Sequence, residues 1–227
     1  MLDVGINQEL ASDYGICMVE RPVIPTTKQK VEHIEVPGRH GSLTKKGAFE
    51  DVLLNIKFQL LEDENIKPLI RRMKAWFLHG KKLYFTDDDV YRKIKHVEIG
   101  DIANEMEEYG EFEVEFTLDP FEYVTTVPLV FTKAETILNP GTVESSPKVE
   151  IHGNGDVKVM VNDVVFQIKG VKNVVTVDSE LLEAYTGTTP MNPNMIGEFP
   201  LLKVGENTIT WTGIVTKLII EPRWRYV

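Results

Sequence analysis

The stretch "EFEVEFTLD", residues 111–119, alternates apolar and polar side chains without a break. Its apolar members are Phe112, Val114, Phe116 and Leu118. Successive side chains of a β-strand point to opposite faces of its sheet, so the alternation predicts a strand with one face in a core and one in water. Segments 54–60, 82–87 and 95–100 read as further strands, which predicts an antiparallel sheet.

One segment of the first half breaks this period of two. Residues 62–80, "EDENIKPLIRRMKAWFLHG", carry apolar residues at helical spacing. The apolar stripe comprises Ile66, Leu69, Ile70, Met73, Trp76 and Phe77. Asp63 or Asn65 is suited to cap the first turn. The segment is therefore predicted to form one helix of about four turns that lies on the sheet.

The second half contains short β-like segments and no helical pattern. Residues 124–147 carry three prolines and several Thr and Ser, which places a predicted domain boundary near residue 135. The stretch "VMVNDVVFQI", residues 159–168, predicts a hairpin with its turn at Asn162-Asp163. Turns at short intervals with no helix favour a β-sandwich. The predicted domains are thus residues 1–134 and 135–227.

Composition excludes several classes of function. The formal net charge of -10 disfavours nucleic-acid binding, which needs a basic surface. The single Cys17 excludes an intrachain disulfide and any multi-cysteine zinc site. No apolar run approaches the roughly 20 residues that span a bilayer, and the N-terminus lacks a signal-peptide pattern. The negative charge is uneven, since residues 97–123 contain acids and no bases.

A Gly-rich stretch at residues 34–51, "IEVPGRHGSLTKKGAFED", is a candidate for a phosphate-binding or catalytic loop. It lacks the Gly-Lys-Ser/Thr ending of a phosphate-binding loop, and a strand follows it where such a loop needs a helix. Ser42 lies outside a nucleophile elbow, and the acids of 86–90 lack the spacing of a calcium loop. The sequence predicts no catalytic residue, no cofactor and no metal. A wall-degrading enzyme would need a carboxylate pair or metal site that the spacing does not reveal.

Sugar binding by the second half is an open alternative. β-Sandwiches that bind carbohydrate expose aromatic side chains, and the candidates are Tyr185, Trp224 and Tyr226. Trp224 and Tyr226 share a facing near the C-terminus and are expected on the surface. Trp211 lies in an alternating strand and is expected in the core.

Several segments, taken in order, resemble the distal tail protein (Dit) family of long-tailed, non-contractile bacteriophages. The resemblance rests on five stretches, which are distributed between residues 21 and 213. They are "RPVIPTTKQKVEHIEVPGRHGSLT" (21–44), "KKLYFTDDDVYRKIKHVEIGDI" (81–102), "YGEFEVEFTLDPFEY" (109–123), "LNPGTVESSPKVEIHGNGDVKVMVN" (138–162) and "IGEFPLLKVGENTITWTG" (196–213). Their order is more specific than any single stretch.

The resemblance implies a mainly β fold. The first domain would be a tail-tube-like β-sandwich with one α-helix and a long extended belt loop, and the second a galectin-like β-sandwich. The family forms hexameric rings at the tail tip and has no enzymatic activity. The belt would reach a neighbouring subunit, and its candidate contact residues are Pro37, Gly38, Arg39, Gly41, Ser42, Lys45 and Lys46. Glu105, Glu107 and Glu108 are candidate partners for its basic residues.

The resemblance also implies partners and a location. The protein would lie in the virion at the tail tip, after synthesis in the cytoplasm of the bacterial host. It would join the tail tube protein to a tail-associated lysin or tail fibre protein and offer a platform to receptor-binding or accessory baseplate proteins. DNA would pass through the ring without specific binding, and no membrane would be involved. The tail-tube protein itself is a further alternative, but it would not need the second sandwich.

Overall fold

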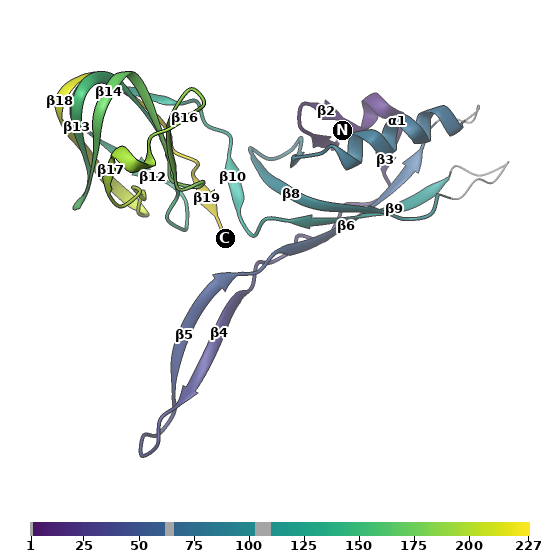
Figure 1. Ribbon diagram of the computed structural model, residues 1–227. Helices are drawn as coiled ribbons and strands as arrows, with labels where there is room; N and C mark the ends of the chain where they lie inside the picture. Colours follow the sequence, from purple (N-terminus) through teal and green to yellow (C-terminus); the bar gives the residue numbers. More distant parts are fainter. Residues whose placement is uncertain (1, 62–65, 103–109) are drawn as a thin grey trace. The chain divides into compact units, whose positions relative to one another are not determined.

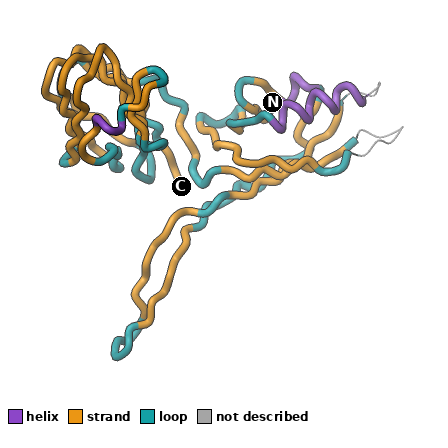
Figure 2. The backbone as a smooth tube through the Cα atoms, viewed as in Figure 1, coloured by secondary structure: helices purple, strands orange, loops and turns teal. Residues whose placement is uncertain are grey.

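The computed structural model describes residues 2–61, 66–102 and 110–227. The chain forms two compact units, residues 1–122 together with Val227, and residues 123–226. Both units consist mainly of β-strands, and one α-helix lies in the first (Figures 1 and 2). The domain boundary predicted from the sequence lies at 134/135. It refers to domains that fold independently, so it stays a prediction.

The first unit is built on one antiparallel sheet with the strand order β2-β1-β7-β8-β9-β6-β3. Its strands are β1 (Val4–Ile6), β2 (Glu9–Leu10), β3 (Ile16–Met18), β6 (Val52–Leu60), β7 (Lys82–Phe85), β8 (Val90–Ile99) and β9 (Glu111–Leu118). A 3-10 helix, η1 (Ala11–Tyr14), links β2 to β3, and α1 (Ile66–Leu78) covers one face of the sheet (Figure 1).

The alternation that predicts β6 and β9 is the pattern by which they bury one face. Every second residue of each strand is buried, beginning with Val52 in β6 and Phe112 in β9. The apolar stripe of α1 covers these residues, with Leu69, Met73, Trp76 and Phe77 buried. The ring of Phe77 lies 5.3 Å from that of Phe58 and 6.0 Å from that of Phe116, between centroids. Helix and strand predictions are thus confirmed here, while Asp63 and Asn65 lie outside the described residues.

The segment expected as an extended belt loop is a hydrogen-bonded β-hairpin. Strands β4 (Gln29–Glu35) and β5 (Ser42–Phe49) pair antiparallel and form a two-stranded sheet of their own. Nearly all of their residues are exposed. Because no core gives these strands an apolar face, their alternation is weak and the sequence suggests only an extended loop.

The second unit contains one eight-stranded antiparallel sheet. The order along it is β11-β18-β13-β14-β15-β16, with β12 on β18 and β17 on β14. The strands are β11 (Leu129–Phe131), β12 (Glu135–Asn139), β13 (Lys148–Val161), β14 (Val164–Asp178), β15 (Glu183–Thr186), β16 (Thr189–Pro190), β17 (Met195–Gly197) and β18 (Gly205–Glu221). A 3-10 helix, η2 (Asn192–Asn194), precedes β17, and β10 (Glu122–Val124) pairs with β19 (Arg225–Tyr226).

Three long strands form the body of this unit. β13, β14 and β18 carry register shifts near Gly153 and Gly155, and such bulges bend strands so that a sheet curls around a core. The apolar core holds Phe166 and Ile168 of β14 with Ile209 and Leu218 of β18. The turn between β13 and β14 falls at Asn162-Asp163, as predicted, with Asn162 at a φ of 53°.

A buried ion pair closes the end of this sheet. The guanidinium of Arg223 donates two hydrogen bonds to the carboxylate of Asp178, at 2.7 and 2.8 Å. The same carboxylate accepts backbone N–H bonds from Glu180 and Leu181, and its side chain is 3 % exposed. Burial alone would raise the pKa of Asp178, but the bonds and charge of Arg223, together with the two N–H groups, outweigh it and lower the pKa.

This lowered pKa predicts a loss of stability in acid. The folded state favours the carboxylate, so Asp178 stabilises the fold at every pH well above the unfolded value of about 3.9. Its contribution is lost as the pH falls from about 4 through the lower folded pKa. We expect the free energy of unfolding of the second unit, measured by urea titration at pH 7, 4 and 3, to fall more steeply than in Asp178→Asn. Equal slopes for the two proteins would contradict the assignment.

Candidate functional site

The predicted belt residues come together on one hairpin. Pro37, Gly38, Arg39 and Gly41 form the tip, and Ser42, Lys45 and Lys46 lie in β5. The N–H of Arg39 donates to the carbonyl of Val36 at 3.1 Å, which closes the turn. Gly38 and Gly41 have φ values of 81° and 77°, a left-handed conformation that glycine adopts without strain. The glycines that suggest a phosphate loop therefore make a sharp hairpin tip.

The root of the hairpin is fixed to the first unit. The hydroxyl of Thr27 donates to the carbonyl of Pro120 at 2.5 Å. The ring of Phe49 meets that of Phe121 edge-on, with centroids 5.6 Å apart. The N–H of Glu50 bonds the carbonyl of Lys28 at 2.8 Å, so the two strands enter and leave side by side. The hairpin is thus held at its base, while its distal part pairs only with itself among the described residues.

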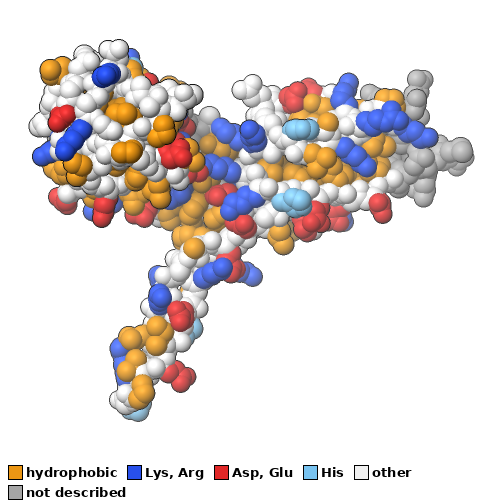
Figure 3. All heavy atoms as spheres, viewed as in Figure 1, with side chains coloured by type: hydrophobic (Ala, Val, Ile, Leu, Met, Phe, Trp, Pro, Cys, Tyr) orange, Lys and Arg blue, Asp and Glu red, His pale blue; other side chains and the backbone are white. Residues whose placement is uncertain are grey.

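Aliphatic side chains near the tip are the part of the site that the sequence reasoning missed. Ile34 of β4 lies directly opposite Leu43 of β5, and the two side chains are 40 % and 41 % exposed. Val36 is also exposed, at 37 %. The signal was present as apolar residues in "VEHIEV" and "GSLT", but the glycines and lysines of the stretch obscured it. The hairpin thus combines an apolar pair with basic residues (Figure 3).

The hairpin is basic in an acidic protein. Residues 29–49 contain four Lys or Arg and two Glu, a formal charge of +2, whereas the whole chain carries -10. One contact within the hairpin offsets a charge, since the ammonium of Lys45 lies 3.7 Å from the carboxylate of Glu32. Both side chains are largely exposed, so this pair adds little stability. The hairpin therefore suits an acidic surface.

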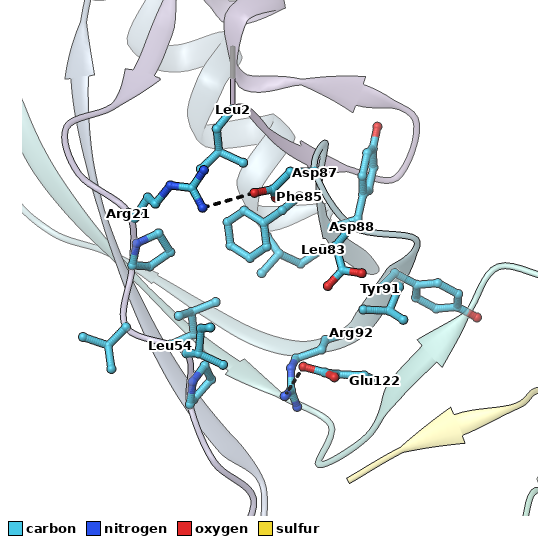
Figure 4. Close-up of a pocket in the computed structure, with 16 residues that line it drawn as sticks. Leu2, Arg21, Leu54, Leu83, Phe85, Asp87, Asp88, Tyr91, Arg92 and Glu122 are labelled. Atoms are coloured by element: carbon cyan, nitrogen blue, oxygen red, sulfur yellow. Dashed lines mark hydrogen bonds and ion pairs between the residues drawn. The ribbon is translucent and has the colours of Figure 1, made fainter. Parts of the chain in front are cut away.

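A groove of about 260 Å³ lies in the same unit, close to the root of the hairpin (Figure 4). One wall is the segment 21–25, "RPVIP", which leads into β4. The facing wall comes from β6, β7 and β8, and its apolar members are Leu54, Leu83, Phe85, Val90 and Tyr91. Val23 and Ile24 are 85 % and 83 % exposed, although both are large aliphatic residues.

Two ion pairs lie at the groove (Figure 4). Arg21 reaches Asp87 at 3.2 Å, and Arg92 reaches Glu122 at 2.7 Å. Since each arginine already has a carboxylate partner, Asp88 gives the lining an acidic excess. Asp89 follows directly in the chain and is exposed.

The aromatic candidates for sugar binding do not form a surface cluster. Trp224 is 6 % exposed and belongs to the core of the second unit, so the expectation that it lies on the surface is wrong. It follows the tightly anchored Arg223 and packs inward. Tyr185 and Tyr226 are partly exposed. Trp211 is partly buried against the core, near where the alternation placed it.

The remaining expectations concern Cys17, metal sites, membrane-spanning helices and the acidic partners of the belt. Cys17 is half-buried and forms no disulfide. Within the described ranges, no three His, Cys, Asp or Glu side chains gather as a metal site would require. The described part of the chain holds no helix with the length and apolar character needed to cross a bilayer. Glu105, Glu107 and Glu108, the expected partners of the belt, lie outside the described residues.

Comparison with known proteins agrees with this architecture. Residues 12–118, which include the hairpin and the groove strands, match the phage tail protein RIFT-related domain family. The Dit protein (gp 19.1) of phage SPP1, described as a paradigm of the hub adsorption apparatus of phages that infect Gram-positive bacteria, superposes with a TM-score of 0.67. The two chains are 14 % identical, and the match covers 97 % of each.

A second solved structure is more distant. A chain of the phage P2 baseplate, in its activated conformation with Ca, matches with a TM-score of 0.47 and 11 % identity, over 97 % of this chain and 98 % of that chain. No curated protein sequence matches. Residues 12–118 are therefore similar to the phage tail protein RIFT-related domain, and the chain as a whole has the fold of the SPP1 Dit protein.

Proposed function

We propose that this protein forms a homohexameric ring at the phage tail tip and joins the tail tube to the baseplate. The observation that carries the proposal is the hairpin of residues 29–49, which is fixed at its root, basic, and exposed along its length. A lone hairpin is marginally stable in water at best, because it buries little apolar surface. Contact with another copy of the chain would cover its apolar pair and explain why it is retained.

The proposed ring leaves a channel for DNA, and the outer face of the first sheet has the charge for it. Glu111, Glu113 and Glu115 alternate with buried residues of β9, so they point away from the core. Glu98 of β8 lies directly opposite Glu115. Like charges opposite one another cost a sheet stability, and a function outside folding accounts for keeping them. Negative channel walls would repel the DNA backbone and let it slide.

This channel makes a prediction for virions that carry altered protein. With Glu111, Glu113 and Glu115 all changed to Lys, we expect DNA release after receptor addition to slow at least about tenfold, because a basic wall binds phosphates. A fluorescent DNA dye measures the release. Three exposed acids of the second unit, Glu135, Glu198 and Glu206, provide the matched Lys control. Equal release rates for the two triple variants would contradict a channel lined by this face.

The second unit would serve as the platform of the ring. Its curled sheet exposes polar and aliphatic residues on its outer face, such as Met160 and its cross-strand neighbour Val165, each 40 % exposed. We assign to it the docking of receptor-binding or accessory baseplate proteins, and to the first unit the contacts with the tail tube and with a tail-associated lysin or tail fibre protein. The role is structural, with no enzymatic step, and the protein would be made in the host cytoplasm before assembly into the virion.

Light scattering on the purified chain tests the ring directly. The proposal requires a species of about 155 kDa, six copies of 25.8 kDa, and a ring with a central hole in electron micrographs. Dilution should dissociate it to the single chain. A protein that stays at 25.8 kDa over a wide range of concentration, and also when tail tube protein is added, would overturn the proposal.

A further inference from the structure

The wall of the groove exposes apolar surface that a monomer does not need to expose. Val23 and Ile24 are the two most exposed large hydrophobic residues of the described chain, and prolines flank them on both sides. Proline restricts the backbone, so this wall is a stiff one. Across the groove lie Leu54 and Phe85. An exposed apolar patch with charged residues at its rim marks a binding surface.

The size of the groove indicates what it binds. Pockets for small molecules measure about 300–1,000 Å³, and the groove, at about 260 Å³, falls below that range. It also offers few hydrogen-bonding groups to orient a ligand, because Arg21 and Arg92 are engaged by carboxylates. A few aliphatic side chains of a protein suit it better than a small molecule does.

The hairpin carries such aliphatic side chains, but the hairpin of a given copy does not reach the groove of the same copy. The wall of the groove ends at Pro25, three residues before Lys28 at the root, whereas Ile34 and Leu43 lie near the tip. Seven residues of β4 span roughly 23 Å at about 3.3 Å per residue, and the paired strands keep the tip away from the root. The occupant must therefore come from another molecule.

The hairpin of a second copy is complementary to the groove in two respects. Its Ile34–Leu43 pair is apolar and projects from a narrow two-stranded arm. Its charge of +2 is opposite to that of Asp88, which lines the groove, and of its neighbour Asp89. Arg39 lies at the tip and Lys46 in β5, within reach of such a rim on either side of the apolar pair.

We propose that the hairpin of one copy inserts Ile34 and Leu43 into the groove of the next copy, with its basic residues on Asp88 and Asp89. The inference rests on the proposed ring and adds the surface that receives the hairpin. Each copy then offers a tip and receives a tip at a different place. Such a head-to-tail contact closes into a ring when its rotation permits.

Cysteine cross-linking tests the contact on the full chain. In a Cys17→Ser background, Leu43→Cys and Val23→Cys are combined in one chain, which contains no other thiol. A disulfide forms only when the two Cα atoms lie about 4.4–6.8 Å apart. Mild oxidation should give a ladder of covalent multimers on a non-reducing gel. The matched control pairs Leu43→Cys with Leu53→Cys, an exposed aliphatic position next to the groove residue Leu54, and should give no ladder.

Charge exchange tests the rim without thiols. Asp88→Lys with Asp89→Lys should weaken assembly at least about tenfold, as should Arg39→Glu with Lys46→Glu. The combination of all four changes should restore most of the loss. Weakening by either pair with no recovery in the combination would argue against direct contact between hairpin and rim.

The outcomes separate this inference from the ring proposal. If light scattering shows the assembled species but the Val23–Leu43 pair gives no ladder, the groove is not the receiving surface and the ring stands. If no assembly occurs at any concentration, the ring proposal fails and the contact fails with it. A ladder in the Leu53 control equal to that of the Val23 pair would also overturn the groove assignment.

Discussion

Replacing Arg223 by Ala is expected to unfold the second unit at a markedly lower temperature and leave the first unit unchanged. The substitution removes both hydrogen bonds that the guanidinium donates to Asp178 and leaves a carboxylate whose side chain is 3 % exposed without a cation. Breaking one partner of a buried pair costs about 3–5 kcal/mol. For a unit of this size that corresponds to a fall in Tm of more than about 10 °C.

Neighbouring groups make the two halves of the pair unequal. Glu180 and Glu221 lie 3.2 and 3.8 Å from Arg223, so the arginine keeps anionic partners when Asp178 is changed. Asp178→Asn also keeps an oxygen that accepts the N–H bonds of the turn. We therefore expect Asp178→Asn to cost less than Arg223→Ala.

Differential scanning calorimetry measures the Tm of each unit and so tests this prediction. The two units provide an internal reference, because the transition of the first unit should stay in place. Lys158→Ala is the matched control, since it removes one cation from an exposed position of the same sheet. Exposed single substitutions rarely change stability by more than about 0.5 kcal/mol. A shift of the Arg223→Ala transition as small as that of Lys158→Ala would contradict the role given to the pair.

The distance between Arg223 and Asp178 also explains why no sequence pattern revealed them. They lie 45 residues apart, and nothing near either residue marks it as part of a buried pair. Strands such as β9 could be predicted because a period of two is a local property. The same reasoning placed Trp224 on the surface together with Tyr226, because residues two apart in a strand share a face. It failed there because the chain near the C-terminus is anchored by Arg223 and follows no long regular strand.

In the candidate site too, the features set by local sequence could be predicted and those set by distant contacts could not. The hairpin tip could be located from its Gly and Pro residues, because turn chemistry is local. Its paired strands could not, since both faces are exposed and neither shows a continuous apolar row. The groove was missed altogether. It brings "RPVIP" next to Leu83 and Phe85, some 60 residues later in the chain, and only the strand order of the sheet places them together.

Removal of the hairpin is expected to abolish the ring while the subunit remains folded. Lys28 and Glu50 are hydrogen-bonded neighbours at the root, so an Asn-Gly turn can replace residues 29–49 with little strain. Loss of the Ile34–Leu43 contact and of the basic residues should weaken association at least about 100-fold, equivalent to about 2.7 kcal/mol per contact. Light scattering at the concentration where the intact chain assembles should then give the mass of a single chain.

Folding of the shortened chain is the necessary control. Because the strands of the hairpin are exposed and pair only with each other among the described residues, and the replacement removes one ring contact, Phe49 on Phe121, the calorimetric transitions of both units should move by only a few degrees. A second variant, Ile34→Ser with Leu43→Ser, keeps the arm and removes only its apolar pair. It should assemble more weakly than the intact chain and more strongly than the shortened one. Should the shortened chain still form the ring, copies must associate through the sheets, and the exposed aliphatic residues of both hairpin and groove would need another occupant.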